Sequence, residues 1–218
     1  MGTQASIDLI NTMYVAYYGR PGDSIGREFW TDLIEENGGE MSPDILAEYG
    51  TSQEYTDQFG SLSNGDLIEN LYAQMFNRTA DVGGKAFWLN ELNTGLRTLS
   101  DAALAIAQGA TGTDKTILDN KVEVADYYTG KLTEPGIPEQ DFSEAKVIIA
   151  AVSADPTSVA TQKAAVDAFF APSAGAELML FAQGIGADNS SDDSEVFDDG
   201  GPIVGLTGLL DSSITADV

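Results

Sequence analysis

Apolar residues recur along this chain at helical spacing, in segments separated by short polar or glycine-containing stretches. The first apolar face lies within residues 8–18 and consists of Leu9, Ile10, Met13, Tyr14 and Tyr17. Positions i, i+3, i+4 and i+7 lie on one side of a helix, so this segment is predicted to be an amphipathic helix. No long run alternates between apolar and polar residues as a half-buried strand does. We therefore expect an all-α fold, in which repeated helical units form a compact body.

The first helical segment belongs to an internal repeat. Residues 8–30 (DLINTMYVAYYGRPGDSIGREFW) align without gaps with residues 66–88 (DLIENLYAQMFNRTADVGGKAFW), with nine identities in 23 positions. In the first copy the identical residues are Asp8, Leu9, Ile10, Tyr14, Arg20, Asp23, Gly26, Phe29 and Trp30. Equal spacing of these residues predicts that the same helical unit is built twice.

Residues that favour helix ends lie at equivalent places in the two copies. The first helix should end at Gly19 or Asn77, which readily adopt a left-handed conformation. The second helix should begin after Asp23 or Asp81, because aspartate is a favourable N-cap. It then carries the Phe-Trp pair and ends near the next glycine, at residues 38–39 or 95.

Further helical stretches follow each copy of the repeat. Ser42 and Ser100 are expected to open a third helix, which contains residues 47–59 in the first copy and 102–110 in the second. Residues 116–129 are predicted to be another helix, and residues 134–138 (EPGIP) break the pattern as a linker.

A pair of helices is predicted next, over residues 141–152 and 157–171. Asp155-Pro156 lies between them and suits a turn that opens a helix, because proline is tolerated in the first helical turn.

Composition divides the chain into three parts. Residues 1–115 contain the two-copy helical repeat, residues 116–171 a helical extension, and residues 172–218 an acidic tail rich in glycine, aspartate and serine. No Lys or Arg follows Lys163. A segment of this composition repels itself and buries little apolar surface, so the tail is expected to behave separately and to be partly extended.

The overall charge is strongly negative. The chain has 35 acidic and 10 basic residues and a formal net charge of −25. Such a charge repels nucleic-acid phosphates and anionic lipids, so we expect no nucleic-acid partner and no membrane insertion. Divalent cations or high ionic strength would relieve the self-repulsion, which favours a calcium-rich or saline environment outside the cell.

Cysteine and histidine are both absent. The chain therefore has no disulfides, no thiolate or imidazole metal ligands, and no Ser-His-Asp or Cys-His catalytic group. A carboxylate pair such as Glu35 and Glu36 would be an alternative acid and base. Adjacent side chains on a helix diverge by about 100° and do not converge on one bond, so we expect that the protein is not an enzyme.

The first twenty residues lack a basic segment, an uninterrupted apolar stretch and a small-residue cleavage site, so they do not form a Sec signal peptide. No segment approaches the length of a membrane span. The expected route of export is a type I system that reads an uncleaved C-terminal signal.

The repeat motif resembles that of a known family. The pattern is Tyr-x3-Tyr/Phe-x-Arg-x2-Asp-x2-Gly-x2-Phe-Trp, with Ser-Gln-Glu-Tyr following at residues 52–55. It is similar to a bacterial repeat domain of unknown function, found in secreted calcium-binding RTX-type proteins and in surface-layer-like proteins, and loosely similar to phycobilisome linker domains. Residues 117–129 and 145–169 resemble the region that follows such repeats, so the resemblance covers roughly residues 5–170.

This resemblance implies an all-α fold, type I export, and a role in surface layers, adhesion or matrix assembly. The glycine-aspartate nonapeptides of RTX proteins are absent from the chain. The resemblance therefore does not imply their calcium-binding roll.

The Arg and Asp of the motif have two interpretations. Arg20 with Asp23, and Arg78 with Asp81, suit a site that binds a carboxylate or a sugar. The favoured alternative is that the arginine stacks on the tryptophan of its own copy and the aspartate caps the next helix. A structural role within the repeat is assigned to Tyr14, Arg20, Asp23, Trp30, Tyr72, Arg78, Asp81 and Trp88.

Aromatic residues are concentrated in the repeat. They are Tyr14, Tyr17, Tyr18, Phe29, Trp30, Tyr72, Phe76, Phe87 and Trp88. They suit a platform for stacking glycans, but their helical spacing favours packing in the core.

The tail contains a cluster of acidic residues at 187–201 (ADNSSDDSEVFDDGG). Closely spaced carboxylates suit calcium, although the order does not match an EF-hand loop, and a solvated acidic run is the alternative. The candidate calcium ligands are Asp192, Asp193, Glu195, Asp198 and Asp199. The last apolar stretch, residues 201–218, is an export signal, a strand that completes another subunit, or a segment that docks on its own helical body.

Together these features predict an extracellular structural protein of a surface layer, filament or matrix, which assembles with its own kind with the help of calcium. The alternative is a cell-surface module that binds lipopolysaccharide or exopolysaccharide.

Overall fold

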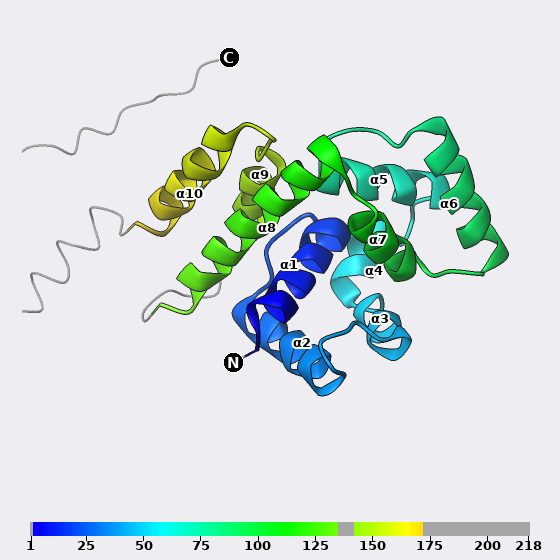
Figure 1. Cartoon of the computed structure of the whole chain (residues 1–218), viewed down its shortest axis with the longest axis horizontal. Helices are drawn as coiled ribbons and strands as arrows, with labels where there is room; N and C mark the ends of the chain where they lie inside the picture. The colour runs from blue at the N-terminus through cyan, green and yellow to red at the C-terminus, as the bar shows by residue number, and fades with distance from the viewer. Residues whose placement is uncertain (1, 135–141, 172–218) are drawn as a thin grey trace, which may run out of the picture. The chain divides into compact units, whose positions relative to one another are not determined.

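The computed structural model describes residues 2–134 and 142–171. This part of the chain contains ten α-helices and no strand, which confirms the all-α prediction (Figure 1). The helices are α1 (Gln4–Tyr18), α2 (Ser24–Glu36), α3 (Pro43–Tyr49), α4 (Gln53–Phe59), α5 (Asn64–Phe76), α6 (Val82–Thr94), α7 (Leu99–Gln108), α8 (Gly112–Leu132), α9 (Ser143–Ala150) and α10 (Pro156–Phe170). Residues 1–171 form one compact unit, and residues 172–218 lie outside the described residues.

The two copies of the repeat are the helix pairs α1–α2 and α5–α6. Helix α1 ends at Gly19 with φ 66°, and α5 ends at Asn77 with φ 57°. Both residues are left-handed C-caps, as predicted. Asp23 and Asp81 are the N-caps of α2 and α6, again as predicted.

The third helical stretch differs from the prediction in both copies. In the first copy it is divided into α3 and α4, because Ser52 caps a new helix through a hydrogen bond from the Tyr55 backbone N–H. In the second copy α7 begins after Thr98 rather than at Ser100, because Thr98 and Asp101 form a reciprocal capping box. The Ser100 hydroxyl instead donates to the carbonyl oxygen of Leu46 at 2.8 Å, which connects α7 to α3.

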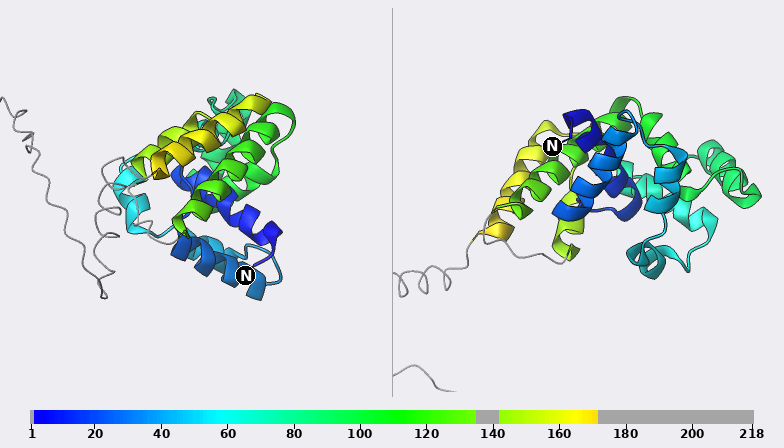
Figure 2. Two further views of the ribbon diagram at one scale, coloured as in Figure 1. Left: turned by 90° about the vertical axis from the view of Figure 1, so that its left-hand side faces the viewer. Right: turned by 90° about the horizontal axis from the view of Figure 1, so that it is seen from below.

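Helix α8 is longer than predicted and lies across both copies. It packs against α1 and α5 on one side and against α10 on the other. Figure 2 shows α8 and α10 side by side. Asp155 caps α10 and Pro156 occupies its first turn, as predicted. The predicted linker at residues 134–138 lies almost entirely outside the described residues.

Helix α1 is the centre of the core. It packs against α2, α5, α7 and α8, and all residues of its C-terminal part, 13–18, are buried. Its buried residues include Val15, Ala16 and Tyr18, which do not belong to the predicted apolar face. The neighbouring helices cover these positions as well, whereas Gln4, Ala5 and Asp8 in the first turns of α1 are exposed.

One buried cation lies between the second copy and α8. Lys121 of α8 is almost completely buried. Its Nζ donates to the carbonyl oxygen of Gln74 and to Oδ1 of Asn77, at the C-terminal end of α5. Carbonyl oxygens at a helix C-terminus have no partner within the helix and carry partial negative charge, so the ammonium satisfies them.

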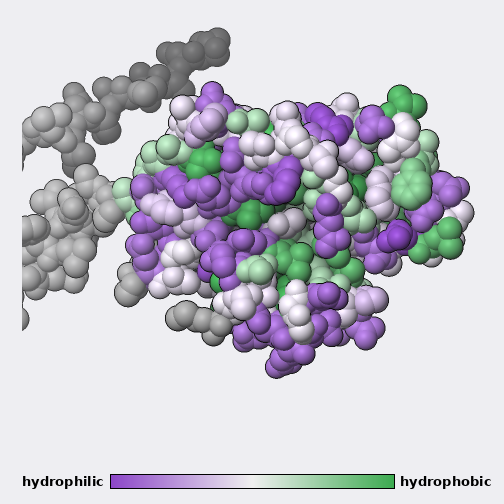
Figure 3. All heavy atoms as spheres, viewed as in Figure 1, coloured by the Kyte–Doolittle hydropathy of each residue, from purple (hydrophilic) through white to green (hydrophobic). Residues whose placement is uncertain are grey.

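The surface of the body is mostly hydrophilic, with apolar side chains visible between the helices and at the end of the body formed by α6 (Figure 3). Three large hydrophobic residues in and next to α6 are exposed, namely Val82, Phe87 and Leu96. None of the helices in the described part of the chain is both long and apolar enough to cross a lipid bilayer.

Candidate functional site

Each copy of the repeat holds an arginine in a two-pronged pair with a carboxylate. Arg20 donates through Nε and Nη2 to Glu54, at 2.9 and 2.6 Å. Arg78 donates through the same atoms to Asp114, at 3.0 and 2.6 Å. Glu54 lies in the first turn of α4 and Asp114 in the first turn of α8. Each pair therefore ties the loop after the first helix of its copy to a helix that begins well after the motif.

Sequence reasoning missed both carboxylates. The partner lies 34 residues after Arg20 but 36 residues after Arg78, so the two do not align when the copies are superposed without gaps. The Ser-Gln-Glu-Tyr element, which contains Glu54, was the available signal, but the second copy has a different sequence there.

The arginines pack on aromatic rings of the preceding helix. The guanidinium carbon of Arg20 is 5.1 Å from the ring centre of Tyr14, and that of Arg78 is 5.1 Å from the ring centre of Tyr72. The predicted stacking on tryptophan is therefore wrong. Each arginine directly follows a left-handed C-cap, which turns the chain back, so its side chain lies over the last turns of its own helix.

The aspartate and glycine of the motif have structural roles that depend on each other. Asp23 accepts a hydrogen bond from the Gly26 backbone N–H at 2.6 Å, and Asp81 accepts one from Gly84 at 2.8 Å. A Cβ atom at Gly26 would lie 2.5 Å from the Tyr14 hydroxyl oxygen, and one at Gly84 would lie 2.8 Å from that of Tyr72. The motif therefore needs glycine here because the tyrosine hydroxyl approaches the start of the second helix.

The Phe-Trp pair has the same geometry in both copies. The ring centres are 5.0 Å apart at 73° for Phe29–Trp30 and 4.9 Å apart at 78° for Phe87–Trp88. Both tryptophans are partly buried and pack against the core. The phenylalanines are 53% and 54% exposed, so the prediction that they pack in the core is wrong. Adjacent helical residues diverge by about 100°, and the tryptophan takes the inward direction.

The remaining aromatic residues of the repeat are buried as predicted. They are Tyr14, Tyr17, Tyr18, Tyr72 and Phe76. Tyr17 stacks on Tyr55, with 4.6 Å between ring centres. Desolvation raises the pKa of Tyr14 and of Tyr17, so both phenols stay neutral throughout the physiological range.

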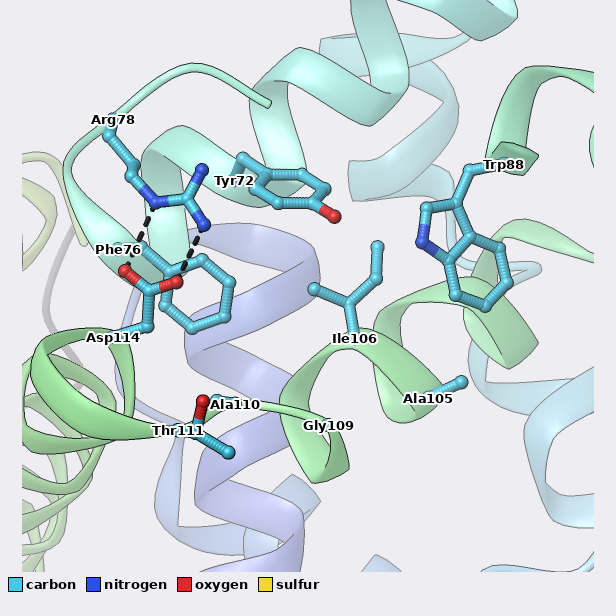
Figure 4. A pocket seen from close by; sticks show the side chains of 10 residues that line it. All are labelled: Tyr72, Phe76, Arg78, Trp88, Ala105, Ile106, Gly109, Ala110, Thr111 and Asp114. Atoms are coloured by element: carbon cyan, nitrogen blue, oxygen red, sulfur yellow. Dashed lines mark hydrogen bonds and ion pairs between the residues drawn. The ribbon is translucent and has the colours of Figure 1, made fainter. Parts of the chain in front are cut away.

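Two surface hollows of related composition lie beside the arginine–carboxylate pairs. The hollow of the first copy has a volume of about 320 Å³ and includes Tyr14, Tyr18, Arg20, Asp23, Trp30, Tyr49 and Glu54 in its lining. The hollow of the second copy has a volume of about 260 Å³ and is lined by Tyr72, Phe76, Arg78, Trp88, Ala105, Ile106, Gly109, Ala110, Thr111 and Asp114. In Figure 4, Arg78 and Trp88 lie on opposite sides of this second hollow, with the Tyr72 ring between them.

The repeat therefore brings together seven of its eight predicted site residues at the two hollows. The exception is Asp81, which caps α6 and does not line the hollow of its copy. The first hollow is also lined by Tyr49, which the sequence analysis did not single out. Its buried hydroxyl has no hydrogen-bond partner within the described part of the chain.

The two arginines differ in exposure. The side chain of Arg20 is 8% exposed and that of Arg78 is 40% exposed. The difference arises from α9, because the Phe142 ring centre lies 4.2 Å from the Arg20 guanidinium carbon. Lys146 Nζ lies 3.8 Å from Oε1 of Glu54 and donates to Oε1 of Gln58 at 2.8 Å. The first site is thus partly covered by a segment from a distant part of the chain.

Burial and pairing act in opposite directions on these groups. Burial alone would raise the pKa of Glu54, but hydrogen bonding to Arg20 lowers that pKa overall. Burial alone would lower the pKa of Arg20, but the same bond raises it. Both groups are therefore charged at neutral pH, and the pair is a fixed ionic contact.

The predicted calcium ligands Asp192, Asp193, Glu195, Asp198 and Asp199 lie outside the described residues, as does the apolar stretch 201–218. Within residues 2–134 and 142–171, no group of three or more carboxylates is placed to hold a metal ion.

The fold and the duplicated motif define an all-α repeat protein. Residues 46–111 match a protein family described as "Domain of unknown function (DUF4214)". This region runs from α3 to the residue before α8 and includes the whole of the second copy. The resemblance to a domain of unknown function is therefore confirmed over these residues, and the match says nothing about RTX-type or surface-layer proteins. No curated protein and no solved structure matches the chain.

Proposed function

We propose that this chain is a non-catalytic structural protein of an extracellular layer, filament or matrix, and that it associates with other copies of itself. The supporting observation is the pair of exposed phenylalanines. Phe29 and Phe87 are identical in the two copies and equally exposed, at 53% and 54%. Each lies at the surface beside a partly buried tryptophan.

Packing and hydrogen bonds within the chain account for the identical tyrosine, arginine, aspartate and glycine that precede this phenylalanine in the motif. The tyrosine supports the arginine, the arginine pairs with a carboxylate, the aspartate caps a helix, and the glycine makes room for the tyrosine hydroxyl. An exposed phenylalanine contributes little to such a core. Large aromatic residues at the surface are typical of protein contacts, because they bury much apolar area at low entropic cost.

Charge explains why apolar contacts and cations would be needed together. Copies with a formal net charge of −25 repel each other at low ionic strength. We propose that calcium at Asp192, Asp193, Glu195, Asp198 and Asp199 reduces this repulsion, and that the exposed phenylalanines provide the contact. Export by a type I system is part of the same proposal.

Replacement of both phenylalanines tests this function. The double variant Phe29→Ser/Phe87→Ser should remain helical but fail to form larger particles in millimolar calcium, as measured by sedimentation velocity. The matched control is Leu96→Ser/Val147→Ser, which changes two residues that are 70% and 62% exposed but lie outside the motif. Equal association of the wild type and the phenylalanine variant would contradict the proposal, as would equal loss in the control.

The second candidate function is glycan binding at a cell surface, and the two hollows favour it. Each combines a tryptophan and a tyrosine with an arginine–carboxylate pair, and the first adds the unpaired Tyr49 hydroxyl. Sugars stack on aromatic rings and donate hydroxyl hydrogens to carboxylates.

A glycan array tests this candidate, with Trp30→Ala and Trp88→Ala as variants. Binding of lipopolysaccharide or exopolysaccharide that depends on both tryptophans would support the glycan role. Binding that neither variant weakens would count against these hollows.

A further inference from the structure

Arg20 of the first copy is covered by the start of α9, and this contact indicates what the equivalent Arg78 of the second copy can bind. We infer that the exposed Arg78–Asp114 pair is a docking site for the start of a helix in a partner protein, one that carries an aromatic ring and, four residues later, a lysine. This inference is independent of the proposed self-association through Phe29 and Phe87.

Arg20 and Arg78 have nearly the same surroundings, except that one aromatic ring beside Arg20 has no equivalent beside Arg78. The Arg20 guanidinium carbon lies 5.1 and 5.3 Å from the ring centres of Tyr14 and Tyr18. The corresponding distances from Arg78 to Tyr72 and Phe76 are 5.1 and 5.6 Å. These contacts and the two-pronged carboxylate pair therefore recur in both copies.

Only the first copy has a third ring. Phe142 lies 4.2 Å from the guanidinium carbon of Arg20, closer than either ring of α1. Phe142 is the N-cap residue of α9, and Lys146 lies one helical turn later. Lys146 reaches toward Glu54, the carboxylate that pairs with Arg20. One short helix start thus provides a ring for the arginine and a cation for the carboxylate.

No described residue provides a third ring at Arg78. Its side chain is 40% exposed and that of Asp114 is 25% exposed. A guanidinium attracts the face of an aromatic ring, and this attraction grows as water is excluded. Each carboxylate oxygen of Asp114 accepts one hydrogen bond from Arg78, and a lysine beside Asp114 would donate to a remaining lone pair. The same chemistry that recruits α9 in the first copy is therefore available at the surface in the second.

The occupant is assigned to a partner because the chain's own α9 is already used. Phe142 and Lys146 contact the first copy, so the same segment cannot cover Arg78 while the body is intact. A partner segment that bears lysine is also complementary in charge to this chain, whose formal net charge is −25.

The test uses a peptide of residues 142–152 (FSEAKVIIAAV), held helical by a hydrocarbon staple between positions 147 and 151. Residues 147 and 151 are exposed in α9 and its C-cap, so the staple leaves Phe142 and Lys146 free to bind. The peptide is titrated into the full chain by isothermal calorimetry. We expect saturable binding of one peptide per chain, weakened at least tenfold by Arg78→Gln.

Matched controls separate docking at Arg78 from other effects. Lys85→Gln removes another surface cation that is paired with a carboxylate, Glu69, and should leave peptide affinity within twofold. Peptides with Phe142→Ala or Lys146→Ala should bind at least tenfold more weakly. In the Trp30→Phe variant, whose single tryptophan is Trp88 in the second hollow, the peptide should change the emission of that tryptophan.

Three outcomes would overturn the inference. One is the absence of saturable binding at millimolar peptide. Another is equal affinity for the wild type and the Arg78→Gln variant, which would place the peptide elsewhere, for example in competition with α9 at Arg20. The third is that the full chain forms a dimer, that Arg78→Gln abolishes this dimer, and that the peptide does not affect it. This result would show that the surface around Arg78 binds a second copy of the chain. Circular dichroism of Arg78→Gln verifies that the variant is folded.

Discussion

Lys121 illustrates how a single buried charge is accommodated in this protein. The ammonium is removed from water but lies at the C-terminal end of α5, where it donates to Gln74 and Asn77. Asn77 also donates through Nδ2 to the carbonyl oxygen of Val152 at 2.6 Å. One left-handed residue therefore ends α5 and links it to α8 and to the end of α9. Desolvation lowers the pKa of Lys121 to about 8.

This depressed pKa predicts how stability varies with pH. In the unfolded chain the pKa of lysine is about 10.4, so between pH 8 and 10 the unfolded state binds more protons than the native state. The free energy of unfolding should therefore rise with pH, by about 2 kcal/mol between pH 7.5 and 9.5. Below pH 8 the cost of burying the charged amine is fully present.

Urea unfolding of the wild type and of Lys121→Met at several pH values measures this effect. The rise should be absent in Lys121→Met, whatever its stability at pH 7.5. Parallel pH profiles for the two proteins would show that the Lys121 amine keeps an ordinary pKa. Measurements should stop below pH 10, because burial raises the pKa of several tyrosines and reverses the trend at higher pH.

At the scale of elements, the residues near each helix end determine where the helix begins and stops. Which helices pack together is determined by residues far apart in the sequence. Gly19, Asn77, Asp23 and Asp81 act as caps through contacts within four residues, so short sequence motifs predicted them. The carboxylates that pair with the arginines lie on α4 and α8, more than 30 residues away. Loop lengths between these helices differ in the two copies, so no fixed spacing in the sequence identified the pairs.

The two arginine–carboxylate pairs should differ in their contribution to stability. Glu54→Gln leaves the buried Arg20 with only the more distant carboxylate of Asp23, 4.0 Å away, and we expect a loss of about 2–3 kcal/mol in the free energy of unfolding. Asp114→Asn leaves Arg78 in contact with water, so the expected loss is below about 1 kcal/mol. Urea unfolding at neutral pH compares the two variants, and equal losses would contradict the role assigned to α9 as a cover for Arg20.

At the scale of the whole molecule, residues 1–171 form one compact unit. Helix α8 contacts the first helices of both copies and also α10, so the repeat and the helical extension share one core. The acidic tail begins after this core.

The fragment 1–171 should fold without the tail but lose the response to calcium. Its circular dichroism and cooperative unfolding should match those of the full chain, because the core lies within these residues. Millimolar calcium should increase the particle size of the full chain in light scattering, and a chelator should reverse the change, since a ligand that binds the assembled state shifts its population. An unfolded fragment, or equal assembly of the fragment in calcium, would contradict this prediction.

The amino-acid sequence by itself determined the helical class, the duplicated unit and most helix ends. These features depend on hydrophobic periodicity and on caps, which act over one or two helical turns. The structural roles of Asp23 and Asp81 were also predictable, because an N-cap bonds to its own helix. The calcium site and the secreted location are predictions from composition and resemblance.

The tertiary structure alone decided which surface each residue faces and what it meets there. Burial of residues 13–18 of α1 follows from the helices that pack against it. Phe29 and Phe87 are exposed because the adjacent tryptophan, and not the phenylalanine, packs against the core. The difference between Arg20 and Arg78 depends on Phe142, more than 120 residues from the first arginine. Such contacts form between segments that are far apart in the sequence. The spacing of residues within a short segment therefore does not predict them.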